Sequence, residues 1–302
     1  MPNLRTLSRQ VRARFREWAV SFLHGSKLHY LEQNLRQIQI ANDYIMSIWL
    51  STRPDHPNPL VGFGRKYFSQ ADEDGILLEI VRRIGVERGV CVEIGVGNGM
   101  ENNTLNLLVR GWCSVWVDAG GLAFDSKCNP KMLSFQQCFV TVENIVSVVT
   151  RGLTELKQSQ VDVLSIDVDG NDGYFVDTLL KAGISPSVIV IETNEVVPPP
   201  VRFAQPYSEY HIWDRTKNSG WSLQSLADLL LGHEYRCVAC NLQTGVNAFF
   251  VRRKHWQLFE DVPQNLEDIY VGRSAHPMKY CDRRSEVTPD LIESLIRNSS
   301  TA

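Results

Sequence analysis

Hydrophobic and polar positions alternate in two regular ways from about residue 70 to residue 253. Short, nearly continuous apolar runs follow one another, and between them lie segments whose apolar residues recur at helical spacing. Continuous apolar runs are typical of strands buried on both faces, and their alternation with helices predicts a parallel sheet. The expected strands are 89–94, 113–120, 134–142, 160–170 and 186–195, with helices at 73–85, 102–111, 143–152 and 174–183.

The end of this region follows a different pattern. After a polar stretch at 193–219, a helix is expected at 221–232 and two further strands at 234–240 and 246–253. Only a short turn joins these two strands, so they must be antiparallel. The predicted fold class is therefore α/β, with a Rossmann-like, mostly parallel sheet that closes with an antiparallel hairpin.

An α-helical appendage is predicted ahead of the sheet. Apolar residues at helical spacing from Leu4 to Phe22 face a row of arginines, and a second helical pattern runs from Leu31 to Ile48. The first helix fits an anionic membrane surface, and the alternative, which we favour, is packing on its own protein or on a second copy. A Pro/Gly-rich linker follows. The expected parts are an appendage at 1–60, a main domain at 61–254 and an extension at 255–302.

Composition narrows the function classes. The 302 residues carry a net charge of −3, which gives no support to a general nucleic-acid-binding role, so we expect no nucleic-acid partner. No apolar run reaches the length of a membrane span, so we expect a cytoplasmic protein, with peripheral membrane contact left open. The seven cysteines are scattered, which favours a reducing compartment. Cys237 and Cys240 form a CxxC, but no second pair completes a zinc site.

A glycine-rich turn follows the first strand. Gly95, Gly97 and Gly99 let the backbone approach a ligand, and the helix that opens near Asn102 would point free N–H groups into the same space. The spacing differs from the dinucleotide motif GxGxxG, and Glu93 precedes it. A carboxylate there repels a pyrophosphate and attracts a cationic ligand.

An acid ends the second strand. Asp118 lies 23 residues after Gly95, where a carboxylate can accept both hydroxyls of a ribose. Glu143 and Asn144 follow the third strand, where they could read an adenine edge or simply cap a helix.

These features resemble class I S-adenosylmethionine (SAM)-dependent methyltransferases, and more narrowly a branch related to the FkbM type. The likeness covers about residues 66–252 and rests on VEIGVGNGMENNTLNLLVRGW, VLSIDVDGNDGYF, VIVIETN and GVNAFFVRR. In this branch NDYW commonly follows DVDG, whereas here Gly173 stands before the aromatic. The expected SAM contacts are Glu93, Gly95, Gly97, Asn98, Gly99, Asn103, Asp118, Glu143, Asn144 and Asp167.

A cluster of acids is expected near the reactive centre. SIDVDGND, which holds Asp167, Asp169 and Asp172, ends the fourth strand, and IETNE, which holds Glu192 and Asn194, ends the fifth. So many carboxylates need a cation, either the sulfonium of SAM or a divalent metal such as Mg or Mn. We expect Asp167 and His211 as candidate bases. The candidate metal ligands are Asp167, Asp169, Glu192 and Asn194. Asp172 is predicted to be a helix N-cap.

The polar stretch at 193–219 is a candidate acceptor pocket. Tyr207, Tyr210 and Trp213 could stack on a sugar or only hold the loop in place. The resemblance implies O-methylation, and a saccharide hydroxyl suits the acidic site. The alternative function is a catalytically silent module that its N-terminal helix recruits to a partner or membrane. Glu93 and the closing hairpin disfavour an NAD-linked oxidoreductase, and DVDGN stands too late in the domain for a phosphatase nucleophile.

Overall fold

The structure is a computed structural model that describes residues 56–213 and 218–272, together with residues 30, 31, 33–38, 40, 41, 45, 289, 293, 296 and 297. The chain divides into two units, Met1–Pro54 and Asp55–Ala302. The helix predicted from Leu4 to Phe22 lies outside the described residues. The described residues between 30 and 45 are helical. The predicted division into three parts stays a prediction.

Within residues 56–213 and 218–272, seven strands form one sheet in the order β3-β2-β1-β4-β5-β7-β6. The first five strands pair in parallel, and β7 is antiparallel to both β5 and β6. This arrangement confirms the predicted α/β class with a mostly parallel, Rossmann-like sheet. The strands are β1 (Val90–Ile94), β2 (Cys113–Asp118), β3 (Leu133–Gln137), β4 (Val163–Ile166), β5 (Val188–Glu192), β6 (Tyr235–Cys240) and β7 (Asn247–Arg252).

The closing antiparallel hairpin is present as predicted, and its last strand, β7, lies between β5 and β6. One detail of the sheet differs from the prediction: the third strand ends at Gln137 instead of continuing to Val142. As the edge strand, β3 has one neighbour only, and the residues after it leave the sheet.

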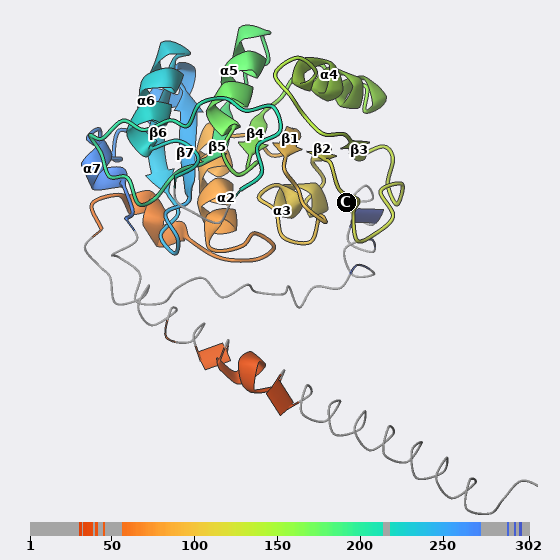
Figure 1. Cartoon of the computed structure of the whole chain (residues 1–302), viewed down its shortest axis with the longest axis horizontal. Helices are drawn as coiled ribbons and strands as arrows, with labels where there is room; N and C mark the ends of the chain where they lie inside the picture. Colours follow the sequence, from red (N-terminus) through yellow and green to blue (C-terminus); the bar gives the residue numbers. More distant parts are fainter. Residues whose placement is uncertain are drawn as a thin grey trace, which may run out of the picture. The chain divides into compact units, whose positions relative to one another are not determined.

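Helices cover both faces of this sheet (Figure 1). One face carries α4, α5 and α6, which contact one another in that order, and α2 and α3 lie on the other side. Their bounds are α2 (Glu73–Ile84), α3 (Leu105–Val109), α4 (Ile145–Glu155), α5 (Asp172–Lys181), α6 (Leu223–Gly232) and α7 (Leu266–Ile269), with 3-10 helices η1 (Pro59–Phe63) and η2 (Arg253–Phe259).

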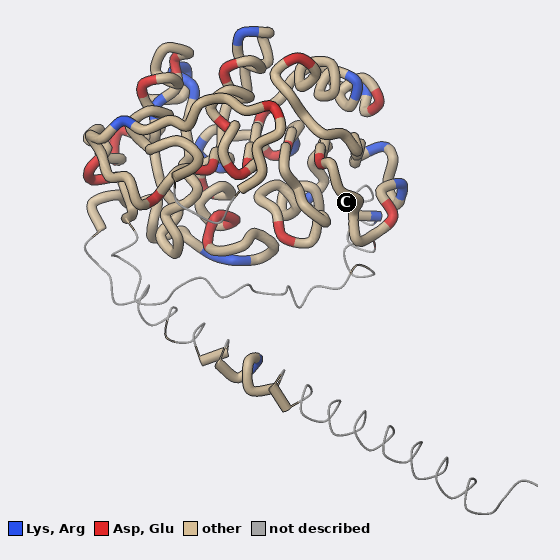
Figure 2. The backbone as a smooth tube through the Cα atoms, in the orientation of Figure 1, with Lys and Arg blue, Asp and Glu red and all other residues tan. Residues whose placement is uncertain are grey.

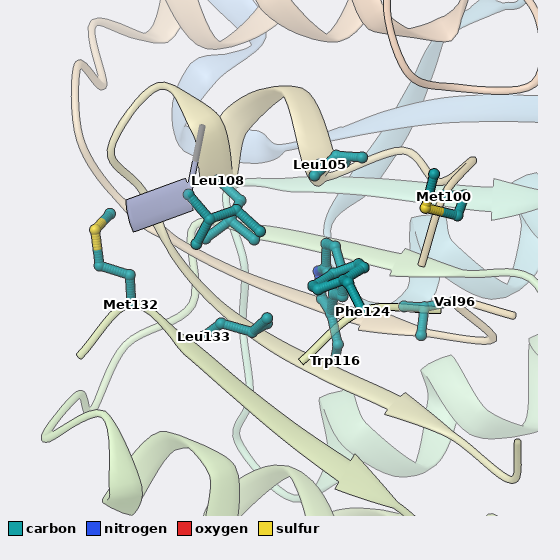
Figure 3. Close-up of a cluster of buried hydrophobic side chains, with 9 residues drawn as sticks. Val96, Met100, Leu105, Leu108, Trp116, Phe124, Met132 and Leu133 are labelled. Carbon is teal, nitrogen blue, oxygen red and sulfur yellow. The ribbon is translucent and has the colours of Figure 1, made fainter. Parts of the chain in front are cut away.

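One part of the core joins the glycine turn to the far end of the chain (Figure 3). Trp116 of β2 packs there with Val96, Phe124 and residues of α3, and Ile296 is fully buried in the same cluster. Asn129 also donates a hydrogen bond to the Ile296 carbonyl at 2.9 Å. The region after residue 254 therefore contributes to the core beneath the glycine turn.

Basic and acidic residues intermingle along the described backbone (Figure 2). Among the described residues, none of the helices combines the length and apolar character needed to cross a bilayer.

Candidate functional site

A cavity of about 440 Å³ opens at the carboxyl ends of the parallel strands. This is the edge at which open α/β sheets bind ligands. Its wall brings together nine predicted site residues: Glu93, Gly95, Gly97, Asn98, Asn103, Asp118, Asp167, Asp169 and His211. Five predicted residues, Gly99, Glu143, Asn144, Glu192 and Asn194, do not line it.

The three glycines of the turn have different functions. All have positive φ, at +88° for Gly95, +56° for Gly97 and +78° for Gly99. A Cβ on Gly95 would collide with the Asp167 carbonyl oxygen, so the turn lies directly against the end of β4. A Cβ on Gly99 would instead meet Leu122 and Phe124. Gly99 therefore seats the turn on the hydrophobic cluster, whereas Gly95 and Gly97 shape the cavity.

Asp118 anchors the loops on either side of the cavity mouth. Its Oδ2 accepts a hydrogen bond from the Gly97 N–H and its Oδ1 one from the Gly120 N–H, both at 2.7 Å. Each carboxylate oxygen has a second lone pair. The side chain can thus hold the glycine turn and still accept two hydroxyl groups from a ligand.

Glu93 is buried and fully engaged by its neighbours. Its Oε1 accepts from the Asn103 N–H at 2.8 Å, and its Oε2 accepts from the N–H and the hydroxyl of Thr104 at 2.9 and 2.5 Å. Burial raises the pKa of this carboxyl, and those hydrogen bonds oppose the rise.

The expectation of free N–H groups at the helix opening near Asn102 is therefore wrong for Asn103 and Thr104. Glu93 takes both N–H groups, and α3 begins only at Leu105. A phosphate can no longer use these donors. Glu93 therefore disfavours a pyrophosphate beside the glycine turn in two ways: its charge repels the phosphates, and it already accepts from the N–H groups that would bind them.

Asparagines in the loop after β1 reach the cavity in different ways. Asn98 braces its own turn, with Oδ1 accepting from the Met100 N–H at 3.1 Å. The Nδ2 of Asn103 donates to the Ser165 hydroxyl at 3.1 Å. Asn102 lines the cavity but was missed among the candidate site residues; it is 5% exposed and neither polar atom of its side chain has a hydrogen-bond partner. A buried amide of this kind needs hydrogen-bond partners, which water or a ligand group can supply.

Glu143 and Asn144 do not contact the cavity. Glu143 is exposed. The Asn144 Oδ1 accepts from the Thr141 N–H at 2.9 Å, and its Nδ2 donates to the Phe139 carbonyl at 2.9 Å. Asn144 therefore stabilises the segment after β3, and it is Cys138, Phe139 and Val140 from this segment that line the cavity. Contacts between this segment and a ligand would therefore come from these three residues.

Three predicted metal ligands converge. Asp167, Asp169 and Glu192 each place a carboxylate oxygen within 4.8 Å of the others. Burial and the charge of Asp169 raise the pKa of Asp167 to about 7. Burial and the charge of Asp167 raise the pKa of Glu192 well above its ordinary value. The cluster thus retains a proton near neutral pH or requires a cation.

Asn194 is the exception among these ligands. Its Nδ2 donates to the Ser219 carbonyl at 2.9 Å, and its Oδ1 accepts from the Val196 N–H at 3.2 Å. The first of these bonds ties the two ends of the 193–219 insertion together, and the second is local. The prediction that Asn194 contributes to the metal site is not supported by this geometry.

Asp172 is structural, though not as an N-cap. Asn171 occupies the N-cap position of α5, and Asp172 is the first helical residue. Its carboxylate accepts from the N–H groups of Val168 and Gly170 at 3.0 and 2.8 Å. These bonds hold the loop in which Asp169 has a φ of +60°, a conformation that costs a non-glycine residue energy. The exposed Asp169 is therefore fixed beside Asp167 by its surroundings.

The insertion contacts loops on both sides of the cavity. The Tyr207 hydroxyl accepts from the Val142 N–H at 3.3 Å, and its ring packs edge-on against Tyr174, so this tyrosine holds the loop in place. Tyr210 stacks on Phe139, which lines the cavity. The His211 Nε2 lies 3.0 Å from the Asp169 carbonyl oxygen. Donation from Nε2 leaves Nδ1 as the basic nitrogen of the neutral ring.

Gly173, which precedes the aromatic residue Tyr174, has a packing explanation. A Cβ at this position would collide with the Trp221 ring. Tyr174 follows it, packs edge-on against Trp221 and donates from its hydroxyl to the Gln205 carbonyl at 2.8 Å. The glycine thus lets the insertion approach the start of α5.

Comparison with known proteins does not place the chain in a family. No family model matches it, and no curated protein matches it.

Proposed function

We propose that the chain is a SAM-dependent methyltransferase that methylates a hydroxyl group, with a saccharide or related molecule as acceptor and with assistance from a divalent cation. One observation carries the proposal: five acids and neither Lys nor Arg appear among the described residues that line the cavity. These acids are Glu93, Glu101, Asp118, Asp167 and Asp169. Such a wall attracts a cationic ligand and opposes a polyanionic dinucleotide.

The residues present fit SAM. The volume lies within the range of small-molecule sites. Gly97 leaves open space where a side chain would stand, and the unpartnered amide of Asn102 offers both a donor and an acceptor. Asp118 would accept the ribose hydroxyls. When bound, SAM supplies an electrophilic methyl group on a sulfonium.

The chain's own groups would position an acceptor and remove its proton. Without a cation at the cluster, the pKa of Asp167 is about 7, which suits this carboxyl to proton transfer at neutral pH. The His211 Nδ1 is a second candidate. In-line placement of the acceptor oxygen could lower the barrier by several kcal/mol.

A divalent cation fits the acid cluster. Asp167, Asp169 and Glu192 offer the carboxylate oxygens that Mg and Mn prefer. When bound, the cation would lower the pKa of an acceptor hydroxyl.

Calorimetry of the full chain with SAM, S-adenosylhomocysteine and NAD, each with MgCl2 and with EDTA, tests the proposal. We expect both sulfur compounds to bind and NAD not to bind. Binding of NAD alone would refute the assignment. Methyl transfer that persists in EDTA would remove the cation from the proposal. SAM binding without methyl transfer to any saccharide tried would favour the catalytically silent module.

Substitution of the ribose acid provides a second test. Asp118→Ala should weaken SAM binding by about tenfold or more, because charged hydrogen bonds are lost. Asp125→Ala is the matched control, since Asp125 also accepts from a local N–H, at 2.9 Å from Lys127, but lies outside the cavity wall. Equal affinities for the two variants would show that the ribose lies elsewhere.

A further inference from the structure

Asn247, the first residue of β7, carries a buried polar atom that its neighbours do not satisfy. The side chain is 3% exposed and lines the cavity, and its Oδ1 has no hydrogen-bond partner among the described residues. The sequence did not identify this residue as part of the site. A buried amide oxygen requires a donor or a cation, so a group from outside the described chain belongs beside it.

The nitrogen of the same amide is held by a buried carboxylate. Asn247 Nδ2 donates to Glu73 Oε1 at 3.1 Å, and this oxygen also accepts from Asn241 Nδ2 at 3.0 Å. Glu73 Oε2 accepts from the Ala71 N–H at 2.8 Å. Because Glu73 faces the amide with an acceptor, it binds Nδ2 and turns Oδ1 to the other side.

The sheet places Asn247 next to the acid cluster. In the antiparallel pair of β5 and β7 the residue directly opposite Asn247 is Glu192. Opposite residues project from the same face of a sheet, with Cβ atoms about 4.5–5.5 Å apart. Glu192 in turn has a carboxylate oxygen within 4.8 Å of those of Asp167 and Asp169. Asn247 therefore extends the cluster by one strand, from β4 and β5 to β7.

We propose that Asn247 Oδ1 is a fourth oxygen ligand of the divalent cation at the acid cluster. The inference rests on the cation of the proposed function and does not depend on SAM. A carbonyl oxygen is a ligand that Mg and Mn take together with carboxylates. It adds a coordinating atom without adding a charge to three carboxylates that already repel one another. Oδ1 and the ionised carboxylate of Glu192 only accept, and a cation between them satisfies both.

Titration of the full chain with MnCl2 in the absence of SAM, followed through the electron paramagnetic resonance signal of free Mn²⁺, tests the ligand. We expect the wild type to bind about one ion per chain, and Asn247→Ala to raise the dissociation constant by about tenfold or more. Unchanged affinity in Asn247→Ala overturns this inference alone. A wild type that binds no Mn²⁺ overturns it together with the cation of the proposed function.

Asn247→Asp separates the oxygen of the amide from its nitrogen. This variant keeps an oxygen in the place of Oδ1 and loses the donor to Glu73. A ligand at this position should retain Mn²⁺ affinity at least equal to that of the wild type, because affinity rises with the charge of the ligands. An Asp variant as weak as Asn247→Ala would show that the bond to Glu73 is what matters, and would overturn the inference. If the Ala variant does not melt cooperatively, the Asp variant decides alone.

Asn129→Ala is the matched control for the loss of a buried asparagine. Asn129 is 7% exposed, donates through Nδ2 to the Ile296 carbonyl at 2.9 Å and lies outside the cavity wall. Its substitution should lower the melting temperature and leave Mn²⁺ affinity unchanged. Equal loss of affinity in the two Ala variants would indicate general destabilisation and overturn the inference.

Calorimetry of the same variants with SAM distinguishes the cation from the cofactor. An Asn247→Ala chain that loses SAM affinity and keeps Mn²⁺ affinity would make Oδ1 a contact of SAM and overturn the inference. A wild type that binds Mn²⁺ through Asn247 and does not bind SAM would support the inference and refute the proposed methyltransferase.

Discussion

Replacement of Glu93 by glutamine tests whether the glycine turn is organised by a buried anion. Glutamine has nearly the shape of glutamate but turns one oxygen into an amide that only donates. Each Glu93 oxygen accepts from a backbone N–H, at 2.8 Å from Asn103 and 2.9 Å from Thr104. The hydroxyl of Thr104 can rotate to become an acceptor, but the backbone donors cannot.

The expected cost follows from these contacts. One charge-assisted hydrogen bond, of about 1.5–3 kcal/mol, is lost, and one buried N–H is left facing another donor at a further cost of about 1–3 kcal/mol. Relief of the carboxylate's desolvation offsets part of this sum. We expect Glu93→Gln to lower the free energy of unfolding by about 2–4 kcal/mol and to weaken SAM binding by about tenfold, because the two donor residues directly precede α3 and Asn103 lines the cavity.

Urea denaturation and calorimetry measure the two effects. Glu101→Gln is the matched control: this side chain lines the same cavity but is 22% exposed and pairs with Lys66 at 3.2 Å, so its change should stay within about 1 kcal/mol. A Glu93→Gln variant within about 0.5 kcal/mol of the wild type would mean that burial keeps the carboxyl protonated. The turn would then not depend on a fixed negative charge.

Three further predictions concern the core, the insertion and the acid cluster. Ile296→Ala should lower the free energy of unfolding by about 2–4 kcal/mol, a loss limited by local detachment of the chain end, while Arg297→Ala should change it by about zero. Equal urea midpoints for the two variants would show that Ile296 does not stabilise the core. Gly173→Ala should cost about 1–3 kcal/mol through its collision with Trp221, and the control Gly232→Ala, with nothing within 4 Å, should be neutral; equal melting temperatures would contradict that packing. The pKa values of Asp167 and Asp172 are raised to about 7 in the folded chain. Their contribution to stability is therefore complete below about pH 4 and is lost as the pH rises through 7, so melting temperatures in EDTA should fall between pH 5.5 and 8. MnCl2 should reduce that slope by favouring the ionised carboxylate of Asp167, and a slope unchanged by MnCl2 would count against a cation at the cluster.

The sheet was predictable because its strands are continuous apolar runs and its ligand edge follows from strand direction alone. Asp118, Asp167 and Asp169 were found for that reason, since Asp118 ends β2 and the other two lie within three residues of the end of β4. Cavity residues from the last strand were not found. Asn247 lines the cavity from β7, and nothing in the pattern indicated that β7 pairs with β5.

Short polar side chains were the least predictable part of the site. Asn144 and Asn194 come after β3 and β5, yet both bond to nearby backbone groups and neither lines the cavity. Asn102 has the same type of side chain, but neither of its polar atoms has a hydrogen-bond partner. The difference depends on where neighbouring carbonyl and N–H groups fall after folding, which spacing along a sequence does not reveal.

The position of β7 between β5 and β6 has a consequence for the order in which the molecule is assembled during synthesis. Until residue 252 has left the ribosome, β5 lacks its second neighbour and exposes an unpaired edge. The site is also incomplete until then, because Asn247 reaches from β7 to Glu73 at the start of α2, with Nδ2 3.1 Å from Oε1. A nascent chain halted before this strand would expose an unpaired, aggregation-prone sheet edge and an incomplete cavity. Ligand binding should therefore begin only when nearly the whole domain has been synthesised.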